Sequence, residues 1–207
     1  MRASIVTFDY FTDIDVFFMW DLLNRVRHPG WRVSILGAQR EHFSSTGIRL
    51  ETHGPLEEAN DSEVVLFTSG QGARRAIEDE RFVSAFRLDP GRQLIGSMCS
   101  GALILARLGL LEGKRATTYP TAVGQLRAMG VEVVEEPFVR EGNVATAAGC
   151  LAAQYLVGWV IEEKLGAAER RRALRMIQPV GEGLSFDDYE GEAGPAAAVA
   201  ANGVVTV

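Results

Sequence analysis

The sequence is short of the side chains on which catalytic sites are most often built. It contains two cysteines and three histidines in 207 residues. Two cysteines do not make the disulfide framework of a secreted domain, so we expect both thiols to be reduced. His42 and His53 lie among polar neighbours without metal-ligand spacing, and we expect them at the surface. Because no group of ligand residues has suitable spacing along the chain, we expect no metal and no organic cofactor.

Two further absences narrow the kinds of partner. No apolar run is long enough to cross a membrane, and residues 1–8 resemble the start of a strand rather than a signal peptide. The net charge is −6, without a clustered basic stripe. The one basic run, at residues 170–175, is explained by a solvated helix face. We therefore expect a cytoplasmic protein that binds a small-molecule substrate, and neither nucleic acid nor a membrane.

The sequence does contain enough apolar side chains for one sizeable core, since 47% of its residues are hydrophobic. The length favours a single domain, which we place at residues 1–180. Residues 181–207 are acidic and then rich in alanine and glycine. We expect them to form a C-terminal tail that is poorly ordered or lies along an edge of the domain.

Short β-rich runs alternate with segments of helical spacing along the predicted domain. The first three runs lie at residues 3–8, 31–36 and 63–67. Helical segments follow the first and third runs, and the second of these segments is interrupted near Asp79. Such alternation predicts an α/β three-layer sandwich around a mostly parallel sheet.

One stretch, residues 93–106, organises the rest of the chain. A short apolar strand leads to Cys99, and an alanine- and leucine-rich helix follows. Such a strand, turn and helix expose the side chain at the turn above the carboxyl end of a parallel sheet. Gly101 leaves room for close helix packing, and the helix N-terminus favours a thiolate over a thiol. Cys99 is therefore a candidate nucleophile, although the turn alone fits a buried structural cysteine equally well.

Three other candidates follow predicted strands. Asp15 lies in the first turn of the first helix, where ligand sites of open parallel sheets gather, but the helix dipole alone would also favour an acidic residue there. Gly70 can present its backbone N–H to an anion, although glycine is also a common turn residue. Cys150 opens an alanine-rich helix and fits a structural thiol better than a catalytic one.

Three blocks together resemble the ThiJ/PfpI superfamily, which has a flavodoxin-like fold and is related to class I glutamine amidotransferases. They are Asp13-Ile-Asp15-Val, Ser69-Gly70 and Met98-Cys99-Ser100-Gly101-Ala102, and the resemblance extends over about residues 5–161. It implies that Cys99 is the nucleophile at the elbow, with Ser100 beside it, and that Asp15 reaches its sulfur. It also implies an anion pocket made by the backbone N–H groups of Gly70 and Ser100, and a homodimer. A neutral Asp15 would lower the pKa of the Cys99 thiol and could later supply a proton.

The chain departs from the histidine-dependent members of this superfamily. Where they place a histidine, this chain has Ser100 and Tyr119. A Cys–His proton relay is therefore not expected, which disfavours protease, deglycase and glyoxalase chemistry. The combination of Asp15, Cys99 and a small hydroxyl residue resembles the isonitrile hydratase-like branch, which converts an isocyanide into an N-substituted formamide. The alternatives are a non-enzymatic, redox-responsive protein whose Cys99 is oxidised to sulfinate, and a scaffold that has lost activity.

A second departure lies in the first helix. Hydratase-like proteins generally continue after the aspartate with a Gly-Pro pair, whereas this chain has Phe17-Phe18-Met19-Trp20. Bulky residues here would reshape the substrate pocket, so Phe18 and Tyr119 are candidates for its lining. Phe17 and Trp20 also have the spacing of an apolar helix face, and we expect them in the core.

Overall fold

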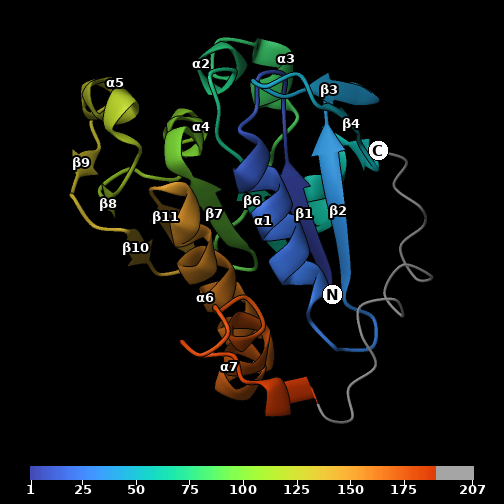
Figure 1. Ribbon diagram of the computed structural model, residues 1–207. Helices are drawn as coiled ribbons and strands as arrows, with labels where there is room; N and C mark the ends of the chain where they lie inside the picture. Colours follow the sequence, from blue (N-terminus) through green and yellow to red (C-terminus); the bar gives the residue numbers. More distant parts are fainter. Residues whose placement is uncertain (190–207) are drawn as a thin grey trace.

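The computed structural model describes residues 1–189, and seven of its strands form one central sheet (Figure 1). From one edge to the other, the strands are β10 (Phe138–Glu141), β11 (Val144–Ala147), β7 (Leu94–Met98), β6 (Val64–Phe67), β1 (Arg2–Val6), β2 (Arg32–Gly37) and β5 (Gly54–Pro55). All neighbours pair in parallel except β10 and β11. The order β2-β1-β6-β7-β11 is that of a flavodoxin-like sheet, whose ligand site lies outside the carboxyl ends of the strands at the switch point. Here that point lies between β1 and β6.

Helices cover both faces of the sheet, so the apolar side chains form two cores (Figure 1). One face carries α1 (Asp13–Asn24) and α6 (Ala153–Leu165), with α7 (Ala167–Arg175) packed on α6. The other carries α2 (Ala73–Ala76), α3 (Glu80–Ser84), α4 (Ala102–Arg107) and α5 (Val123–Ala128). Successive strand residues enter opposite cores: Ile5 belongs to the first and Val6 to the second. The predicted α/β three-layer sandwich with a mostly parallel sheet is confirmed.

Two segments leave the central sheet. Between β2 and β6 the chain forms the antiparallel hairpin of β3 (Glu41–Phe43) and β4 (Arg49–Glu51), followed by the 3-10 helix η1 (Leu56–Asp61). Beyond α4, the short strands β8 (Arg115–Ala116) and β9 (Glu132–Val133) pair in parallel on either side of α5. The predicted break near Asp79 is confirmed, because its carboxylate accepts a hydrogen bond from the Arg81 backbone N–H and caps α3.

The aromatic residues of α1 divide between surface and core. Phe17 is 37% exposed, so the prediction that it belongs to the core is wrong. Met19 is fully buried and helps to form the apolar face of the helix instead. Phe18 and Trp20 are half-buried and pack against the core, and the Trp20 ring stacks on His53 with centroids 5.2 Å apart.

The chain continues beyond α7 with a turn and the 3-10 helix η5 (Phe186–Tyr189). An ion pair of 2.5 Å joins Arg175 of α7 to Asp188. The first residues of the predicted tail, 181–189, thus lie beside α7, and residues 190–207 lie outside the described residues. Within residues 1–189, no helix combines the length and the apolar character needed to cross a bilayer.

Candidate active site

Cys99 lies at the turn between β7 and α4, where the sequence predicts a nucleophile elbow. Its φ of 46° is a left-handed value, which costs a non-glycine residue about 1–3 kcal/mol. Close packing holds the chain in this conformation: a Cβ atom at Gly101 would lie 2.5 Å from the Thr68 carbonyl oxygen. The Thr118 hydroxyl also donates a hydrogen bond of 2.8 Å to the Cys99 carbonyl. The strained elbow is thus fixed from two sides.

Asp15 lies in the first turn of α1, beyond the carboxyl end of β1, and its side chain has no exposed surface. One carboxylate oxygen accepts a hydrogen bond from the Ser69 hydroxyl. Among the described residues, no N–H or O–H group donates to the other oxygen, Oδ1. A buried carboxyl with one unsatisfied oxygen is costly, and such an atom is typical of a functional site.

The fold brings two thiols to this carboxyl. A carboxylate oxygen of Asp15 and the Sγ atoms of Cys99 and Cys150 all lie within 4.8 Å of one another. Sequence analysis did not place Cys150 at the site, because its approach to Cys99 depends on the pairing of β11 with β7. The same three atoms could in principle ligate a soft metal ion, a group that spacing along the chain does not show. They are three ligands rather than the four of a closed structural site, and the expectation of no metal stays a prediction.

Burial controls the protonation of the three groups. It raises the pKa of the Asp15 carboxyl, against smaller lowering effects of the hydrogen bonds from Ser69 and the thiols. It also raises the pKa of the Cys99 thiol, and the adjacent Asp15 charge adds to this rise. Burial and the same charge raise the pKa of Cys150 to about 11. The expected lowering of the Cys99 pKa is therefore absent from the resting site, because desolvation outweighs the helix N-terminus.

The predicted anion pocket is already occupied in part by hydrogen bonds within the protein. The Gly70 backbone N–H donates to the Ser100 hydroxyl at 3.0 Å, and that hydroxyl lies 3.1 Å from the Gly70 carbonyl. The Cys99 sulfur instead accepts a hydrogen bond from the backbone N–H of Gly149, which favours the thiolate. Sequence reasoning missed Gly149, since only the β7 to β11 register brings it to the elbow. An anion held by Gly70 and Ser100 would have to share or replace their mutual contact.

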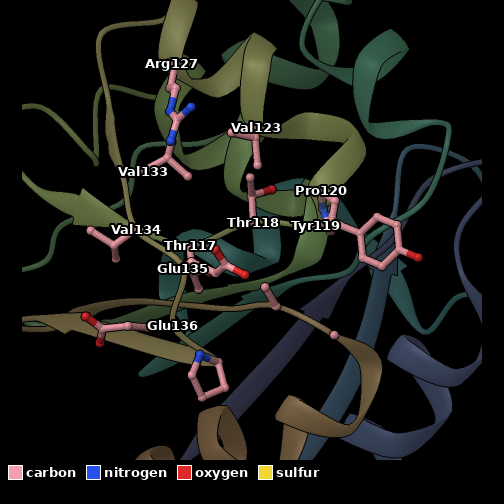
Figure 2. Close-up of a pocket in the computed structure, with 13 residues that line it drawn as sticks. Thr117, Thr118, Tyr119, Pro120, Val123, Arg127, Val133, Val134, Glu135 and Glu136 are labelled. Atoms are coloured by element: carbon pink, nitrogen blue, oxygen red, sulfur yellow. The ribbon is translucent and has the colours of Figure 1, made fainter.

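A cavity of about 740 Å³ adjoins the elbow (Figure 2). Thr118 and Gly149, which contact Cys99, belong to its lining, and so does Tyr119, the candidate for the lining of the substrate pocket. In Figure 2, Tyr119 lies on one side of the cavity and Glu136 on the opposite side. Phe18 is not part of this lining. The rest of the lining is Thr117, Pro120, Val123, Arg127, Val133, Val134, Glu135, Pro137 and Ala148.

The three histidines lie elsewhere. His42 is only 2% exposed, so its predicted surface position is wrong. Its Nδ1 atom lies 3.1 Å from the Asp9 carboxylate, and this contact offsets the cost of burying the ring. His53 is exposed, accepts the Ile35 backbone N–H and stacks on Trp20. His28 is exposed beyond the end of α1. Among the described residues, the titratable groups grouped with Cys99 are therefore Asp15 and Cys150.

Ser69→Ala is expected to raise the pKa of Asp15 further, because the lost hydroxyl hydrogen bond favours the ionised carboxylate. Leaving the buried carboxyl without this donor should cost about 1–3 kcal/mol of unfolding free energy. Thermal unfolding and the pH profile of Cys99 alkylation measure both effects. Ser97→Ala is the matched control: it removes another buried hydroxyl, one that has no hydrogen-bond partner among the described residues, and equal losses in both variants would contradict the assignment.

Comparison with known proteins agrees with this geometry. Residues 1–163 match the model of the DJ-1/PfpI family. An isonitrile hydratase from Pseudomonas putida is 34% identical over 124 residues, which cover 56% of this chain and 54% of that enzyme. A deglycase from Pyrococcus abyssi is 26% identical over 147 residues, covering 69% of this chain and 87% of the deglycase. The chain thus spans about half of the hydratase and most of the deglycase.

The fold comparison points the same way. A solved ThiJ/PfpI family protein from Pseudomonas syringae matches with a TM-score of 0.77 at 21% identity, covering 93% of this chain and 76% of that one. At this level of identity the match shows a shared fold.

Proposed function

The chain belongs to the DJ-1/PfpI family, and from that premise we propose that it is a cysteine-dependent hydratase that converts small isocyanides into N-substituted formamides. The observation that carries the proposal is the buried Asp15 carboxyl beside the Cys99 sulfur. A carboxyl in this position can move protons at the sulfur without imidazole. The similarity to the Pseudomonas putida isonitrile hydratase supports the same chemistry.

The reaction adds water to the terminal carbon of the isocyanide. The Cys99 sulfur attacks that carbon while Asp15 accepts the thiol proton, and the carboxyl then gives this proton to the same carbon, which leaves a thioimidate. Water adds across the C=N bond, its oxygen to carbon and one proton to nitrogen through Asp15. As the C–S bond breaks, the hydroxyl proton returns to the sulfur through Asp15 and the formamide leaves.

The protonation of the resting site suits this sequence of steps. Because burial raises the pKa of both Asp15 and Cys99, the two groups compete for one proton rather than both being ionised. A thiol whose proton moves to a neighbouring carboxyl during attack does not need to be ionised beforehand. The Gly149 N–H favours the sulfur anion as it develops.

Access to the sulfur favours a slender substrate. Cys99 is only 3% exposed. The adjoining cavity reaches the elbow through two of its lining residues, Thr118 and Gly149. An isocyanide presents its reactive carbon at the end of a linear C–N unit, so it needs little space beside the sulfur.

Direct assay tests the proposal. Purified protein is incubated with a panel of aliphatic and aromatic isocyanides, and formamide is followed by absorbance and proton NMR. Turnover that needs both Cys99 and Asp15 supports the hydratase. Absence of turnover across the panel, with Cys99 converted to sulfinate by dilute peroxide, would reject it in favour of the redox-responsive alternative.

We also propose that the protein is a homodimer, formed through an apolar patch on α1 and the β3–β4 hairpin. Five large apolar side chains on α1, on the loop before it and on the hairpin are each at least 37% exposed: Tyr10, Ile14, Phe17, Phe43 and Ile48. The Tyr10 backbone N–H donates a hydrogen bond of 2.7 Å to the Phe43 carbonyl, which joins the loop before α1 to the hairpin. Exposed patches of this kind often mark protein interfaces.

Phe43→Glu is expected to convert this dimer into monomers, because it places a charge in a desolvated interface. Light scattering after size-exclusion chromatography measures the mass. Phe186→Glu is the control, since Phe186 is 85% exposed and lies outside the patch. A wild-type protein that is monomeric at micromolar concentration, or a dimer that survives Phe43→Glu, would contradict the assignment.

A further inference from the structure

Cys99 and Cys150 meet because of the register of two parallel strands. β7 and β11 are neighbours, with Met98 opposite Ala147. Cys99 directly follows Met98, and Cys150 opens the 3-10 helix η4 (Cys150–Ala152) shortly after Ala147. The two Sγ atoms and a carboxylate oxygen of Asp15 lie within 4.8 Å of one another.

We propose that Cys99 and Cys150 form a reversible intramolecular disulfide when the protein meets a peroxide, with Cys150 the sulfur that is oxidised first. This goes beyond the proposed hydratase, which uses Cys99 and gives Cys150 no task. The bond would withdraw the Cys99 sulfur from any nucleophilic reaction until a dithiol reduces it. It would also protect Cys99 from irreversible oxidation.

The environments of the two thiols set the order of oxidation. Cys99 is 3% exposed, whereas Cys150 is partly exposed. Burial raises the pKa of both thiols, but that of Cys150 only to about 11, and that of Cys99 rises further. Reaction with peroxide follows exposure and thiolate fraction, and both favour Cys150.

The oxidation balances with the groups present and one peroxide. The Cys150 thiolate attacks one peroxide oxygen, the O–O bond breaks, and the leaving oxygen takes up the proton that the thiol gave to Asp15. The product is a Cys150 sulfenic acid. Cys99 then gives its proton to Asp15, and its sulfur attacks the Cys150 sulfur. The S–O bond breaks and the hydroxide takes that proton from Asp15, so two thiols and one hydrogen peroxide give a disulfide and two water molecules.

The Asp15 carboxyl is placed for both proton transfers. It is fully buried, it interacts with both thiols, and its Oδ1 atom accepts no hydrogen bond from an N–H or O–H group of the described residues. A buried carboxyl that has an unsatisfied oxygen and lies within 4.8 Å of both sulfurs is a local proton acceptor for either thiol.

The turn before η4 can close the remaining gap. A disulfide needs an S–S distance of about 2.05 Å, so the sulfurs must approach by less than about 3 Å. The movement falls on residues 149–151, where Leu151 is 68% exposed and the space beside Gly149 is open. The central sheet and the fully buried residues of α6 need not move.

Mass spectrometry of the full chain tests the proposal. The reduced protein, held in chelator-containing buffer, is treated with one equivalent of hydrogen peroxide and then alkylated. We expect the mass of the chain to fall by that of two hydrogen atoms and both cysteines to resist alkylation. Digestion should give a disulfide-linked Cys99–Cys150 peptide, and a dithiol should restore both free thiols. A Cys99 that gains two oxygen atoms while Cys150 remains alkylatable would overturn the proposal, and so would disulfides only between chains.

Single variants test the order of oxidation. In Cys99→Ser, a dimedone probe should trap a Cys150 sulfenic acid. In Cys150→Ser, the probe should trap Cys99 at least about tenfold more slowly than it traps Cys150 in Cys99→Ser. The reverse result, with rapid trapping at Cys99 and none at Cys150, would overturn the assigned order. Circular dichroism confirms that each variant is folded, and Cys99→Ala with Cys150→Ala provide a second pair. None of these readouts depends on isocyanide turnover, so the disulfide and the proposed hydratase can fail independently.

Discussion

Cys99→Ala should lower kcat/KM for isocyanide hydration by at least about 10⁴-fold, the loss expected when a covalent nucleophile is removed. Cys150 also lies beside Asp15, but it is not at the elbow, where the Gly149 N–H favours the anion of the Cys99 sulfur, so we expect no replacement by Cys150. Cys99→Ser should be equally inactive, since a serine hydroxyl needs a stronger base than a carboxylate, and the histidines lie elsewhere. Steady-state formamide production measures the loss.

Stability measurements on the elbow provide the control for that result. Cys99 has a φ of 46°, so an alanine there keeps the strain, whereas Cys99→Gly removes about 1–2 kcal/mol of it. Both variants should be inactive, but Cys99→Gly should unfold at a higher temperature than Cys99→Ala. An alanine variant that stays folded and keeps more than a few per cent of wild-type turnover would remove Cys99 from the mechanism.

Local sequence patterns were sufficient to predict the elbow at Cys99 and the three layers of the fold. The apolar run before Cys99 and the helical spacing after it predicted the elbow. Gly101 was expected to allow close packing, and a Cβ atom there would indeed lie only 2.5 Å from the Thr68 carbonyl oxygen. Strand and helix alternation predicted the three layers. These features depend on neighbours in the chain, so a linear pattern contains them.

The rest of the site depends on tertiary register. Cys150 and Gly149 reach Cys99 only because β11 pairs in parallel with β7, and no spacing along the chain encodes that pairing. The pKa of Cys99 depends on burial by layers that fold around it, so the helix N-terminus alone predicted the wrong direction. Phe17 was expected in the core from its spacing, but the helix buries Met19 instead.

A shared proton acceptor links the two proposals. In both proposals Asp15 accepts the Cys99 proton, because the attack on an isocyanide and the condensation with Cys150 both begin with a protonated thiol in a buried site. The hydratase returns the proton to substrate carbon, and the disulfide reaction gives it to hydroxide. A site that pairs one carboxyl with two thiols can therefore be active when reduced and protected when oxidised.

Asp15→Asn is the second variant with a large expected effect, and it should act on activity and stability in opposite directions. Turnover should fall by about 10²–10⁴-fold, because an amide cannot accept the thiol proton. Wild-type kcat/KM should itself fall as pH drops through the raised pKa of Asp15, since protonation removes that acceptor. At neutral pH the variant should be more stable than the wild type, because it removes a carboxyl that is costly to ionise when buried.

The sign of the stability effect follows from proton linkage. The pKa of Asp15 is higher in the folded protein than the ordinary value of 3.8, so between the two values the folded state binds more protons than the unfolded chain. The unfolding free energy of the wild type must therefore fall as pH rises through this interval. Asp15→Asn lacks the titrating carboxyl, so its unfolding free energy lacks this pH dependence. Thermal unfolding at pH 4, 6 and 8 should show a Tm advantage for the variant that grows with pH, with both thiols protonated throughout. A variant that is less stable than the wild type at all three values and still turns over isocyanides would show that Asp15 is a structural hydrogen-bond acceptor, and the proton route through it would have to be abandoned.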